Sequence, residues 1–480
     1  MFKLAGGSVI AQAVAILVSP VLARLYTPEV FGLAAIFTTI TSIIGVIACL
    51  RYDLAILLPK DDGDAANVLS TSLLCAVFIT IVSGLIFLFF HAHILSLLQA
   101  EKLAPYLLAI PVIVFFNAMF LALNNWNSRM KLFGRLAINR TAQAVGTSGS
   151  QLLLGLMGFV TAGSLIWSTA GGVVVGCSIL AIMIWHEDGR FFRKTIGLKK
   201  IAESFKKYKK FPLIDSWGSL LNVVSRQMPL ILLGVFFTGA TVGHYALASR
   251  VIYLPMSMIG GAIGNVFFQR VAEAHSKEED VGRLVKMVFR RLVMVALLPS
   301  LLIVFMGTDY FTFIFGSKWV EAGIFSRMLA AWMFVWFISS PLTILFVVYN
   351  RLESAFVVHV ILLVVRTVPL IIGGMVGNAY LAIALFACSG ILAYGGLLFW
   401  CSSLAGVSML EQLQIIYQEA LYVIPVVGAI LLFKIGFGLS AGIVFFVSLF
   451  GMLAYGVLLV RRDPELLEYF NNIKQRIVKK

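Results

Sequence analysis

Residues 68–90 read VLSTSLLCAVFITIVSGLIFLFF, a stretch without one charged side chain. About 20 apolar residues in a helix are enough to cross the hydrocarbon core of a bilayer. Similar stretches recur along the 480-residue chain, which is 60% hydrophobic and 12% charged. Because soluble proteins carry roughly 25% charged residues, this composition excludes one large water-soluble core. The sequence predicts an all-α integral membrane protein.

Fourteen stretches are long and apolar enough to be predicted as transmembrane helices. The ninth and thirteenth are short, and the fifth begins with the polar pair Asn139 and Arg140. The predicted spans are residues 4–24, 30–50, 68–90, 105–126, 139–160, 164–185, 212–237, 242–268, 292–306, 325–349, 355–376, 379–400, 421–437 and 440–460.

Lys and Arg residues are distributed unevenly between the predicted loops. With the N-terminus in the cytoplasm, the inner segments hold 29 of the 37 and the outer loops hold four. Cytoplasmic loops of multispanning proteins gather Lys and Arg, so this asymmetry predicts the orientation and an even number of spans. Both termini are predicted to be cytoplasmic, and the first apolar stretch is expected to remain as a span rather than to be cleaved.

The net charge of +15 does not indicate a nucleic-acid partner. A nucleic-acid-binding protein gathers its basic residues on a folded, water-exposed face. Here the basic residues lie between apolar runs, which is the pattern of membrane topology.

The richest basic loop, residues 186–210, separates six predicted spans from eight. Ile201, Phe205 and Tyr208 recur there at helical spacing among lysines, which predicts an amphipathic helix on the inner leaflet. A specific lipid-headgroup site is the alternative interpretation of this helix. The predicted organisation is an N-terminal lobe with its basic linker at 1–210, a C-terminal lobe at 211–400, and two final spans with a cytoplasmic amphipathic tail at 401–480.

A faint internal repeat supports two six-span lobes. Thr27 and Gly32 follow the first span, and Thr238 and Gly243 follow the seventh, with the same Thr-x4-Gly spacing. Spans one and seven enter the membrane in the same direction. The repeat would therefore be parallel, with lobes related about the membrane normal and able to rock around a shared central cavity.

Arginines inside the predicted spans are the sharpest functional signal, because an Arg at the centre of a span costs about 2.5 to 3.5 kcal/mol on insertion scales. Arg226 and Arg366 fall near the middle of spans seven and eleven, and Arg250 falls in the outer half of span eight. Arg24 and Arg140 lie near span ends, where snorkelling to the interface is the alternative explanation. These five arginines are the predicted substrate-binding residues.

Carboxylates are expected to be absent from the interior of the membrane. Asp215 comes closest to a predicted span centre, but it precedes Arg226 by eleven residues, which is about 16 Å along a helix. Guanidinium groups without neighbouring carboxylates suit an anionic cargo, and their planar fork matches phosphate. We therefore predict a cationic cavity that receives an anionic substrate.

No catalytic or metal-binding pattern is apparent. The five cysteines are scattered through or beside apolar segments, and the chain has no P-loop, no His-Glu zinc pattern and no nucleophile elbow. The sequence predicts no cofactor, no metal and no enzymatic activity. A membrane enzyme such as a glycan polymerase or ligase would be expected to have a large outer loop, whereas the longest predicted here are about 91–104 and 307–324.

Three stretches of the sequence resemble those of a known family, and the resemblance depends on their order and spacing along the chain. They read LARLYTPEVFG at 22–32, RYDLAILLPK at 51–60 and GHYALASRVIYLP at 243–255. The chain resembles the Wzx-type flippases, the polysaccharide transporter branch of the multidrug/oligosaccharidyl-lipid/polysaccharide (MOP) superfamily. The resemblance covers nearly the whole chain in length, span count and loop pattern.

The resemblance implies roles for two arginines. Related lipid II flippases carry an Arg at the end of the first span and another in the eighth span shortly before a Pro, which match Arg24 and Arg250. In that family such residues line a cationic central cavity. Ser249 stands where the lipid II branch usually has an acidic residue, so its charge pairing does not carry over. Asp53 beside Arg51 belongs to the pattern of the polysaccharide branch.

The function implied is flipping an undecaprenyl-diphosphate-linked oligosaccharide across the bacterial inner membrane for O-antigen, capsule or exopolysaccharide synthesis. Membrane lipids, a polysaccharide polymerase and a chain-length regulator are the expected partners. The alternative is a cation-coupled multidrug exporter of the same superfamily. Such an exporter would need a buried carboxylate for cation exchange.

Overall fold

The computed structural model describes residues 2–462, apart from the side chains of residues 2–6 and 8 and of several positions within 254–265 and 352–359. This part of the chain is helical and contains no strand. The predicted amphipathic tail at the C-terminus lies outside the described residues.

The chain divides into two compact units, Met1–Ala246 and Leu247–Lys480. The helices of the first unit are α1 (Phe2–Leu25), α2 (Pro28–Ile47), α3 (Tyr52–Ala55), α4 (Asp62–Leu97), η1 (Glu101–Tyr106), α5 (Ala109–Arg129), α6 (Phe133–Leu156), α7 (Ala162–Thr195), α8 (Leu198–Lys207), the π-helical turn η2 (Phe211–Asp215) and α9 (Ser216–Phe236). Helix α10 (Gly239–Ser276) starts in this unit and continues into the next.

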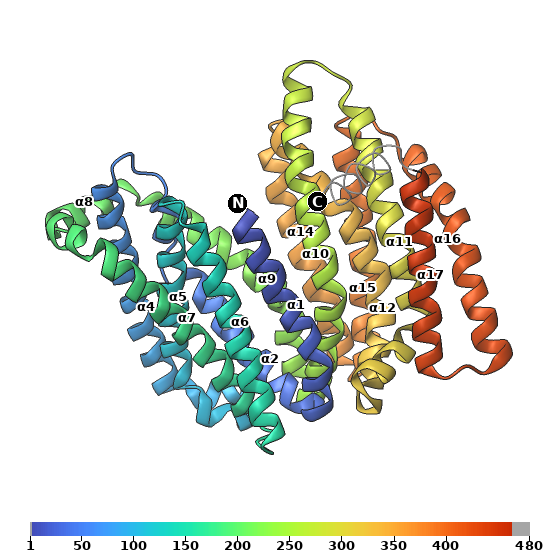
Figure 1. The fold of residues 1–480 in the computed structure, drawn as a ribbon, viewed down its shortest axis with the longest axis horizontal. Coiled ribbons are helices and arrows are strands. Elements are labelled where there is room, and N and C mark those ends of the chain that lie inside the picture. The colour runs from blue at the N-terminus through green and yellow to red at the C-terminus, as the bar shows by residue number, and fades with distance from the viewer. Residues whose placement is uncertain (1, 463–480) are drawn as a thin grey trace, which may run out of the picture. The chain divides into compact units, whose positions relative to one another are not determined.

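The second unit continues from α10 with a bundle of long helices (Figure 1). Helices α11 and α12 pack together, α15 packs on both α12 and α14, and the final pair α16 and α17 packs on α11. Their bounds are α11 (Val281–Phe315), η3 (Ser317–Trp319), α12 (Val320–Ser339), η4 (Ser340–Ile344), α13 (Leu345–Val348), α14 (Leu352–Met375), α15 (Ala379–Ser403), α16 (Met409–Phe437) and α17 (Ala441–Arg462).

Side-chain caps define where several long helices begin. A helix start leaves backbone N–H groups without partners, and a preceding Ser, Thr, Asp or Asn oxygen can accept from them. Ser408 and Glu411 form a reciprocal capping box at the start of α16. Single side-chain caps are supplied by Thr27, Asp61, Thr161, Asp280 and Asn378.

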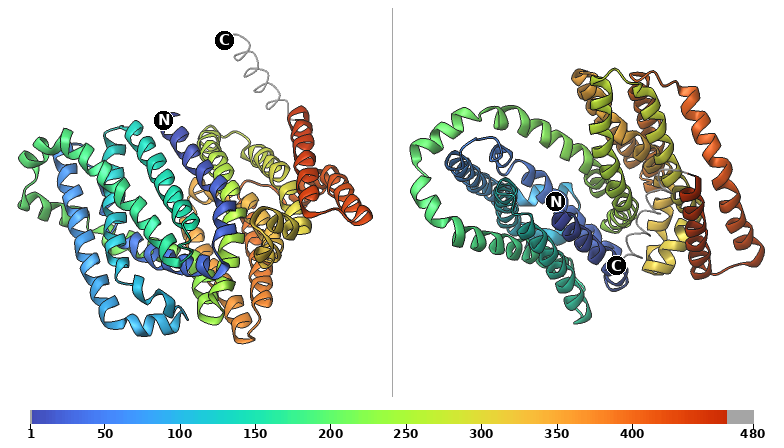
Figure 2. Two further views of the ribbon diagram at one scale, coloured as in Figure 1. Left: turned by 60° about the horizontal axis from the view of Figure 1, so that its bottom comes forward. Right: turned by 45° about the horizontal axis from the view of Figure 1, so that its top comes forward.

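Helices α1 and α6 run parallel and side by side in the first unit (Figure 1 and Figure 2). Near their starts, a Cβ added to Gly7 would lie 2.7 Å from the Cα of Ala137. Near their ends, a Cβ added to Gly155 would lie 3.0 Å from Leu25 Cδ1. Glycine thus lets the two backbones approach closely, which is typical of helices packed in membranes.

The structure confirms the all-helical membrane class. Each predicted span overlaps one of the long helices, and ten helices of the described chain are long and apolar enough to cross a membrane. Two further apolar helical segments are shorter, and these are Val9–Leu25 and Val360–Met375. Helices α6 and α10 are not in either group, so the number fourteen stays a prediction.

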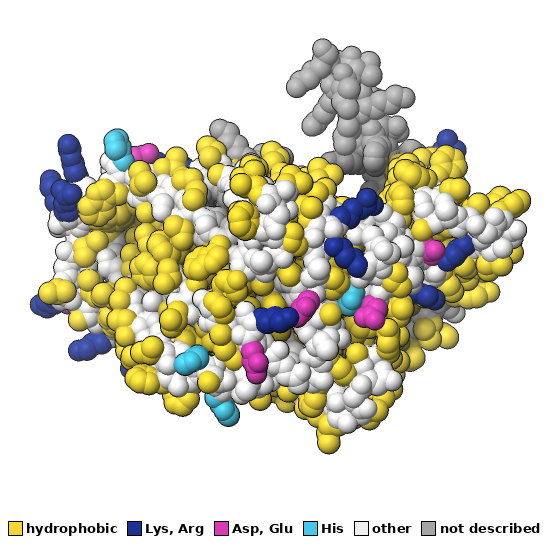
Figure 3. Space-filling model, turned by 90° about the horizontal axis from the view of Figure 1, so that it is seen from below, with side chains coloured by type: hydrophobic (Ala, Val, Ile, Leu, Met, Phe, Trp, Pro, Cys, Tyr) yellow, Lys and Arg dark blue, Asp and Glu magenta, His cyan; other side chains and the backbone are white. Residues whose placement is uncertain are grey.

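Large apolar side chains point outward over much of both units. Phe89, Leu392 and Phe450 are 72%, 77% and 74% exposed. Figure 3 shows apolar atoms across most of the face that it displays. Exposed apolar surface of this extent needs a nonpolar environment, and lipid supplies it.

The predicted outer segment at 307–324 is largely helical, because α11 continues to Phe315 and η3 and α12 follow it. Asp309 therefore lies within a helix, where its carboxylate is 2.6 Å from Lys434 Nζ on α16. This ion pair joins α11 to α16.

The basic linker contains the predicted amphipathic helix, which is α8. Its Ile201 is buried, and the backbone carbonyl of Phe205 accepts a hydrogen bond of 3.1 Å from the Tyr52 hydroxyl. The side chain of Asn67 on α4 holds the entry to α8, since it donates to Thr195 O at 3.2 Å and accepts from Gly197 N at 3.1 Å. Part of the apolar face of α8 thus rests on the protein, and contact with the leaflet stays a prediction.

Ionic contacts fasten α16 and α17 to α11. The carboxylate of Glu419 on α16 is fully buried and lies 2.8 Å from Arg290 Nε on α11 and 2.9 Å from Arg462 Nη1 on α17. The Arg462 guanidinium also lies 3.6 Å from the centre of the Tyr422 ring. One buried anion thereby joins three helices.

Replacing Glu419 with Gln should lower the free energy of unfolding by about 1–3 kcal/mol, because two arginines lose the anion that compensates them. The matched control is Glu411→Gln on the same helix, which breaks the half-exposed pair with Lys286 and should cost less than about 1 kcal/mol. Thermal unfolding in detergent measures both. Equal losses for the two variants would contradict the role given to Glu419.

Candidate functional site

The five predicted substrate-binding arginines are divided between the two units. Arg24, Arg140 and Arg226 belong to the first, whereas Arg250 and Arg366 belong to the second. All five are at least partly accessible, and Arg24, Arg226 and Arg250 are classed as exposed. None of the five residues is therefore fully buried.

Arg24 and Arg140 lie far apart along the α1–α6 pair. Arg24 is in the last turn of α1, next to Leu25, which contacts α6 near the end of that helix. Arg140 is three residues beyond Ala137, which contacts the beginning of α1. At 1.5 Å per residue, about 20 Å separates the two arginines along the helix axes. The two arginines therefore belong to opposite ends of the α1–α6 pair.

Arg226 lies at the middle of α9, where this helix packs on α2. The neighbouring Gln227 accepts a hydrogen bond of 3.4 Å from the Thr39 hydroxyl, which is halfway along α2. Under the predicted orientation, Arg140, Arg226 and Arg24 follow one another from the inner toward the outer side. These three residues therefore occupy three successive levels along the helices of the first unit, and we call them the arginine ladder.

Arg366 on α14 is held in place by α15. Its Nη2 donates a hydrogen bond of 2.6 Å to the hydroxyl of Tyr394, and the hydroxyl of Ser389 donates to the carbonyl of Val365 at 3.1 Å. Tyr394 is buried. Tyr394 was not among the predicted site residues, because nothing in a single sequence links a residue to another that is 28 positions further along.

A second group of polar residues lies at the end of the first unit that the sequence predicts to be cytoplasmic. Arg51 Nε lies 2.9 Å from Asp215 Oδ2 at the start of α9, so this arginine links the loop after α2 to α9. The backbone of Arg51 is left-handed, with φ of 62°. Asp53 is buried close by, and Asn125 Nδ2 lies 3.4 Å from its carboxylate. Asp215, which the sequence placed nearest to a span centre, therefore pairs with Arg51.

Arg129 organises the loop that carries this group. Its guanidinium donates to the carbonyl oxygens of Ile56 at 3.2 Å and Pro59 at 2.7 Å, and it pairs with Asp62 at 2.8 Å. Much of the RYDLAILLPK pattern at 51–60 thus has a structural role, which is to form a fixed turn between α2 and α4.

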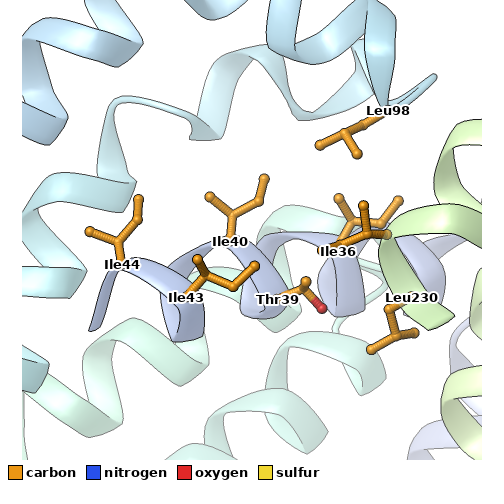
Figure 4. Close-up of a pocket in the computed structure, with 8 residues that line it drawn as sticks. Ile36, Thr39, Ile40, Ile43, Ile44, Leu98 and Leu230 are labelled. Atoms are coloured by element: carbon orange, nitrogen blue, oxygen red, sulfur yellow. The ribbon is translucent and has the colours of Figure 1, made fainter. Parts of the chain in front are cut away.

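A small apolar pocket opens between α2 and α9 (Figure 4). Its volume is about 160 Å³, and Thr39 supplies the polar side chain of its wall. Such a lining suits a hydrocarbon segment and offers nothing that would hold a phosphate or a sugar. The remaining lining residues are Ile36, Ile40, Ile43, Ile44, Leu98, Leu230 and Ile231.

Metal-binding clusters are not found in the described part of the chain, where no three His, Cys, Asp or Glu residues gather. The buried carboxylates of Asp53 and Glu419 have polar neighbours of other kinds. Asp53 lies beside Asn125 in the loop region between α2 and α4, and Glu419 is held by two arginines.

Asp53 predicts a pH dependence of stability. Burial raises the pKa of Asp53 above its usual value, and the charge of Arg51 opposes this effect. The folded protein therefore binds the proton more tightly than the unfolded chain, so stability falls as pH rises from the unfolded pKa through the folded one. Asp53→Asn should raise the melting temperature at neutral pH and have little effect below the unfolded pKa.

Thermal unfolding between about pH 3 and pH 8 measures this dependence, because the unfolded pKa of Asp is about 3.9. The control is Asp61→Asn at the exposed start of α4. If Asp53→Asn follows the same pH profile as the wild type, the pH dependence does not come from Asp53.

Known proteins were compared with this chain by sequence and by structure. Residues 21–323 match the model of a polysaccharide biosynthesis protein family. No curated protein sequence gives a match. The structure is similar to the lipid II flippase MurJ in an inward closed conformation, with a TM-score of 0.74 at 12% identity over 96% of this chain and 99% of that one.

Two further solved structures share the fold. A MOP superfamily transporter from Pyrococcus furiosus matches with a TM-score of 0.56 at 14% identity, over 85% of this chain and 96% of that one. An outward-facing MATE multidrug transporter matches with a TM-score of 0.52 at 13% identity, over 84% and 95%. The chain is therefore a multi-pass membrane protein with the MOP transporter fold, and it belongs to the polysaccharide biosynthesis protein family that its sequence matches.

Proposed function

We propose that this protein is a flippase that moves undecaprenyl-diphosphate-linked oligosaccharide repeat units across the bacterial inner membrane. The cargo would serve O-antigen, capsule or exopolysaccharide synthesis. The observation that carries the proposal is the set of accessible arginines along the helices of a chain that belongs to a polysaccharide biosynthesis family. The similarity to a structure described as a lipid II flippase supports it, because that cargo is also lipid-linked.

The spacing of the arginines favours a stepwise passage. A diphosphate binds planar guanidinium groups through short, charge-assisted hydrogen bonds. Since about 20 Å separates Arg140 from Arg24 along the helices, we propose that the anionic group passes from one to the other by way of Arg226. Arg250 and Arg366 of the second unit would contribute to the same cationic cavity.

The transport cycle proposed is alternating access between an N-terminal lobe at 1–210 and a C-terminal lobe at 211–400, with 401–480 forming the last two spans and the tail. Both termini would face the cytoplasm. A transporter of this kind makes and breaks no covalent bond. A polymerase and a chain-length regulator are the proposed functional partners downstream.

A cation-coupled multidrug exporter is the second candidate, and the similarity to the MATE transporter favours it. An exporter of this kind would use a carboxylate inside its cavity. Glu419, buried in the second unit, is already neutralised by Arg290 and Arg462. This arrangement favours the flippase.

Deleting the gene should make lipid-linked repeat units accumulate on the cytoplasmic leaflet, and the wild-type gene should remove them. We expect Arg250→Ala to lower the transport rate at least tenfold and Arg250→Lys to restore part of it, because Lys keeps the charge but loses the planar fork. The matched control is Arg351→Ala, which changes an exposed arginine outside the proposed cavity. Full activity of both Arg250 variants would exclude this residue from the mechanism, and no accumulation on deletion would favour the exporter.

Tyr394 and Arg366 provide a paired test. Tyr394→Phe removes the hydroxyl that holds the guanidinium but leaves the charge, so we expect a smaller loss of transport than with Arg366→Ala. The rate of appearance of the lipid-linked sugar on the outer leaflet of reconstituted vesicles measures both variants. A larger loss with Tyr394→Phe would show that the phenol, and not the guanidinium, is the functional group of this pair.

A further inference from the structure

The two Thr-x4-Gly segments noted in the sequence adopt the same local structure. Thr27 precedes α2, and its hydroxyl oxygen accepts from Val30 N at 3.4 Å. Thr238 precedes α10, and its hydroxyl oxygen accepts from Thr241 N at 3.4 Å. Both segments lie within the first compact unit. Each therefore starts a helix with the same threonine cap.

The two segments also contact each other reciprocally through their glycines. A Cβ added to Gly32 would lie 1.8 Å from Gly239 O and 2.9 Å from Gly243 N. A Cβ added to Gly243 would lie 1.8 Å from Pro28 O and 2.9 Å from Gly32 N. Each contact is thus repeated with the roles of the two segments exchanged, which is the property of a two-fold axis.

The symmetry is the one that the sequence repeat predicts. The separation is 211 positions between Thr27 and Thr238, and it is again 211 positions between Gly32 and Gly243. A parallel repeat places the axis along the membrane normal, and the glycine contact lies on the local axis. The duplication that is faint in the sequence is therefore expressed as a specific backbone contact.

The contact leaves no room for a side chain, let alone for a substrate. Backbone atoms of α2 meet backbone atoms of α10, and neither side has a flexible group that could yield. The beginnings of both helices are on the outer side in the predicted orientation. Neighbouring contacts hold the same region, because Lys102 pairs with Glu29 at 2.7 Å and Gln99 donates to Val235 O at 2.9 Å.

We propose that the contact between Gly32 and Gly243 is the outer closure of the transport path, which must open and re-form in each cycle. This inference rests on the proposed function, because only a transporter that alternates its access needs such a closure. A hard backbone contact gives a well-defined closed state, because interfaces of this kind switch between discrete arrangements rather than deform gradually.

A reversible cross-link tests whether the closure must open. The Cγ of Glu29 lies 3.5 Å from the position of a Cβ on Gly239, so Glu29→Cys with Gly239→Cys can form a disulfide. The control pair is Gly84→Cys with Pro111→Cys, which joins α4 to α5 in the same unit, where the Cβ positions are 3.9 Å apart. Both pairs are made in a Cys388→Ser background, because Cys388 is the exposed cysteine of the described chain.

In reconstituted vesicles, oxidation of the first pair should lower flipping at least tenfold, and a reductant should restore it. The oxidised control pair should keep the rate of its reduced form. Undiminished flipping by the cross-linked first pair, with the disulfide verified by mass spectrometry, would overturn the closure. If the wild-type protein flips no lipid-linked sugar, the proposed function fails instead. Whether the glycine contact is a closure is then tested by a measurement that does not depend on transport.

That measurement is the reaction of Gly239→Cys with a membrane-impermeant thiol reagent. Gly32→Ala should accelerate the reaction at least tenfold, because its methyl group must push the beginnings of α2 and α10 apart. Gly45→Ala is the matched control on α2, since a Cβ there meets nothing within 4 Å. Equal rates in the Gly32→Ala and Gly45→Ala backgrounds would contradict the contact as a closure.

Discussion

Hydrocarbon offers no partner for a polar group, and this constraint shapes the whole molecule. Every backbone N–H and C=O inside the bilayer must find its partner within the chain, which makes each crossing segment a helix. The same constraint requires any charge inside the protein to have a partner or an aqueous surface. The all-helical fold and the placement of the ion pairs both follow from it.

Several ion pairs of the described chain join helices. Glu419 binds arginines from two helices, and Lys434 pairs with Asp309 toward the opposite end of α16. Arg51 and Asp215 connect the loop after α2 to the π-helical turn before α9. Apolar packing between helices is non-directional, and in each case a charged contact adds a direction to it. Electrostatics thereby supplies specificity that lipid-exposed apolar faces lack.

The arginines and the glycine contact describe two aspects of the proposed transport. The ladder of Arg140, Arg226 and Arg24 supplies positive charge at several depths, so an anion would meet a partner throughout the passage. The contact of Gly32 with Gly243 supplies a closed outer end whose geometry depends on backbone atoms alone. In the proposed mechanism, arginine side chains would bind the cargo, whereas the backbone contact would act as the closure.

Some of this could be predicted from the sequence because the relevant signals are local. Hydropathy over about 20 residues gave the helices, and the threonine and proline at 27 and 28 predict a helix start. The amphipathic spacing around Ile201 correctly predicted α8. The resemblance to a polysaccharide transporter family was confirmed by the match over residues 21–323. The role of the arginines in binding stays a prediction.

The sequence by itself determined the membrane class, the helical segments and the family, because composition and apolar run length are properties of short stretches. Only the tertiary structure decided that Arg24 and Arg140 lie about 20 Å apart, that Tyr394 holds Arg366, and that Gly32 meets Gly243. These contacts join residues from 28 to 211 positions apart. Their formation depends on how whole helices pack, and packing is set by the shapes of many side chains together.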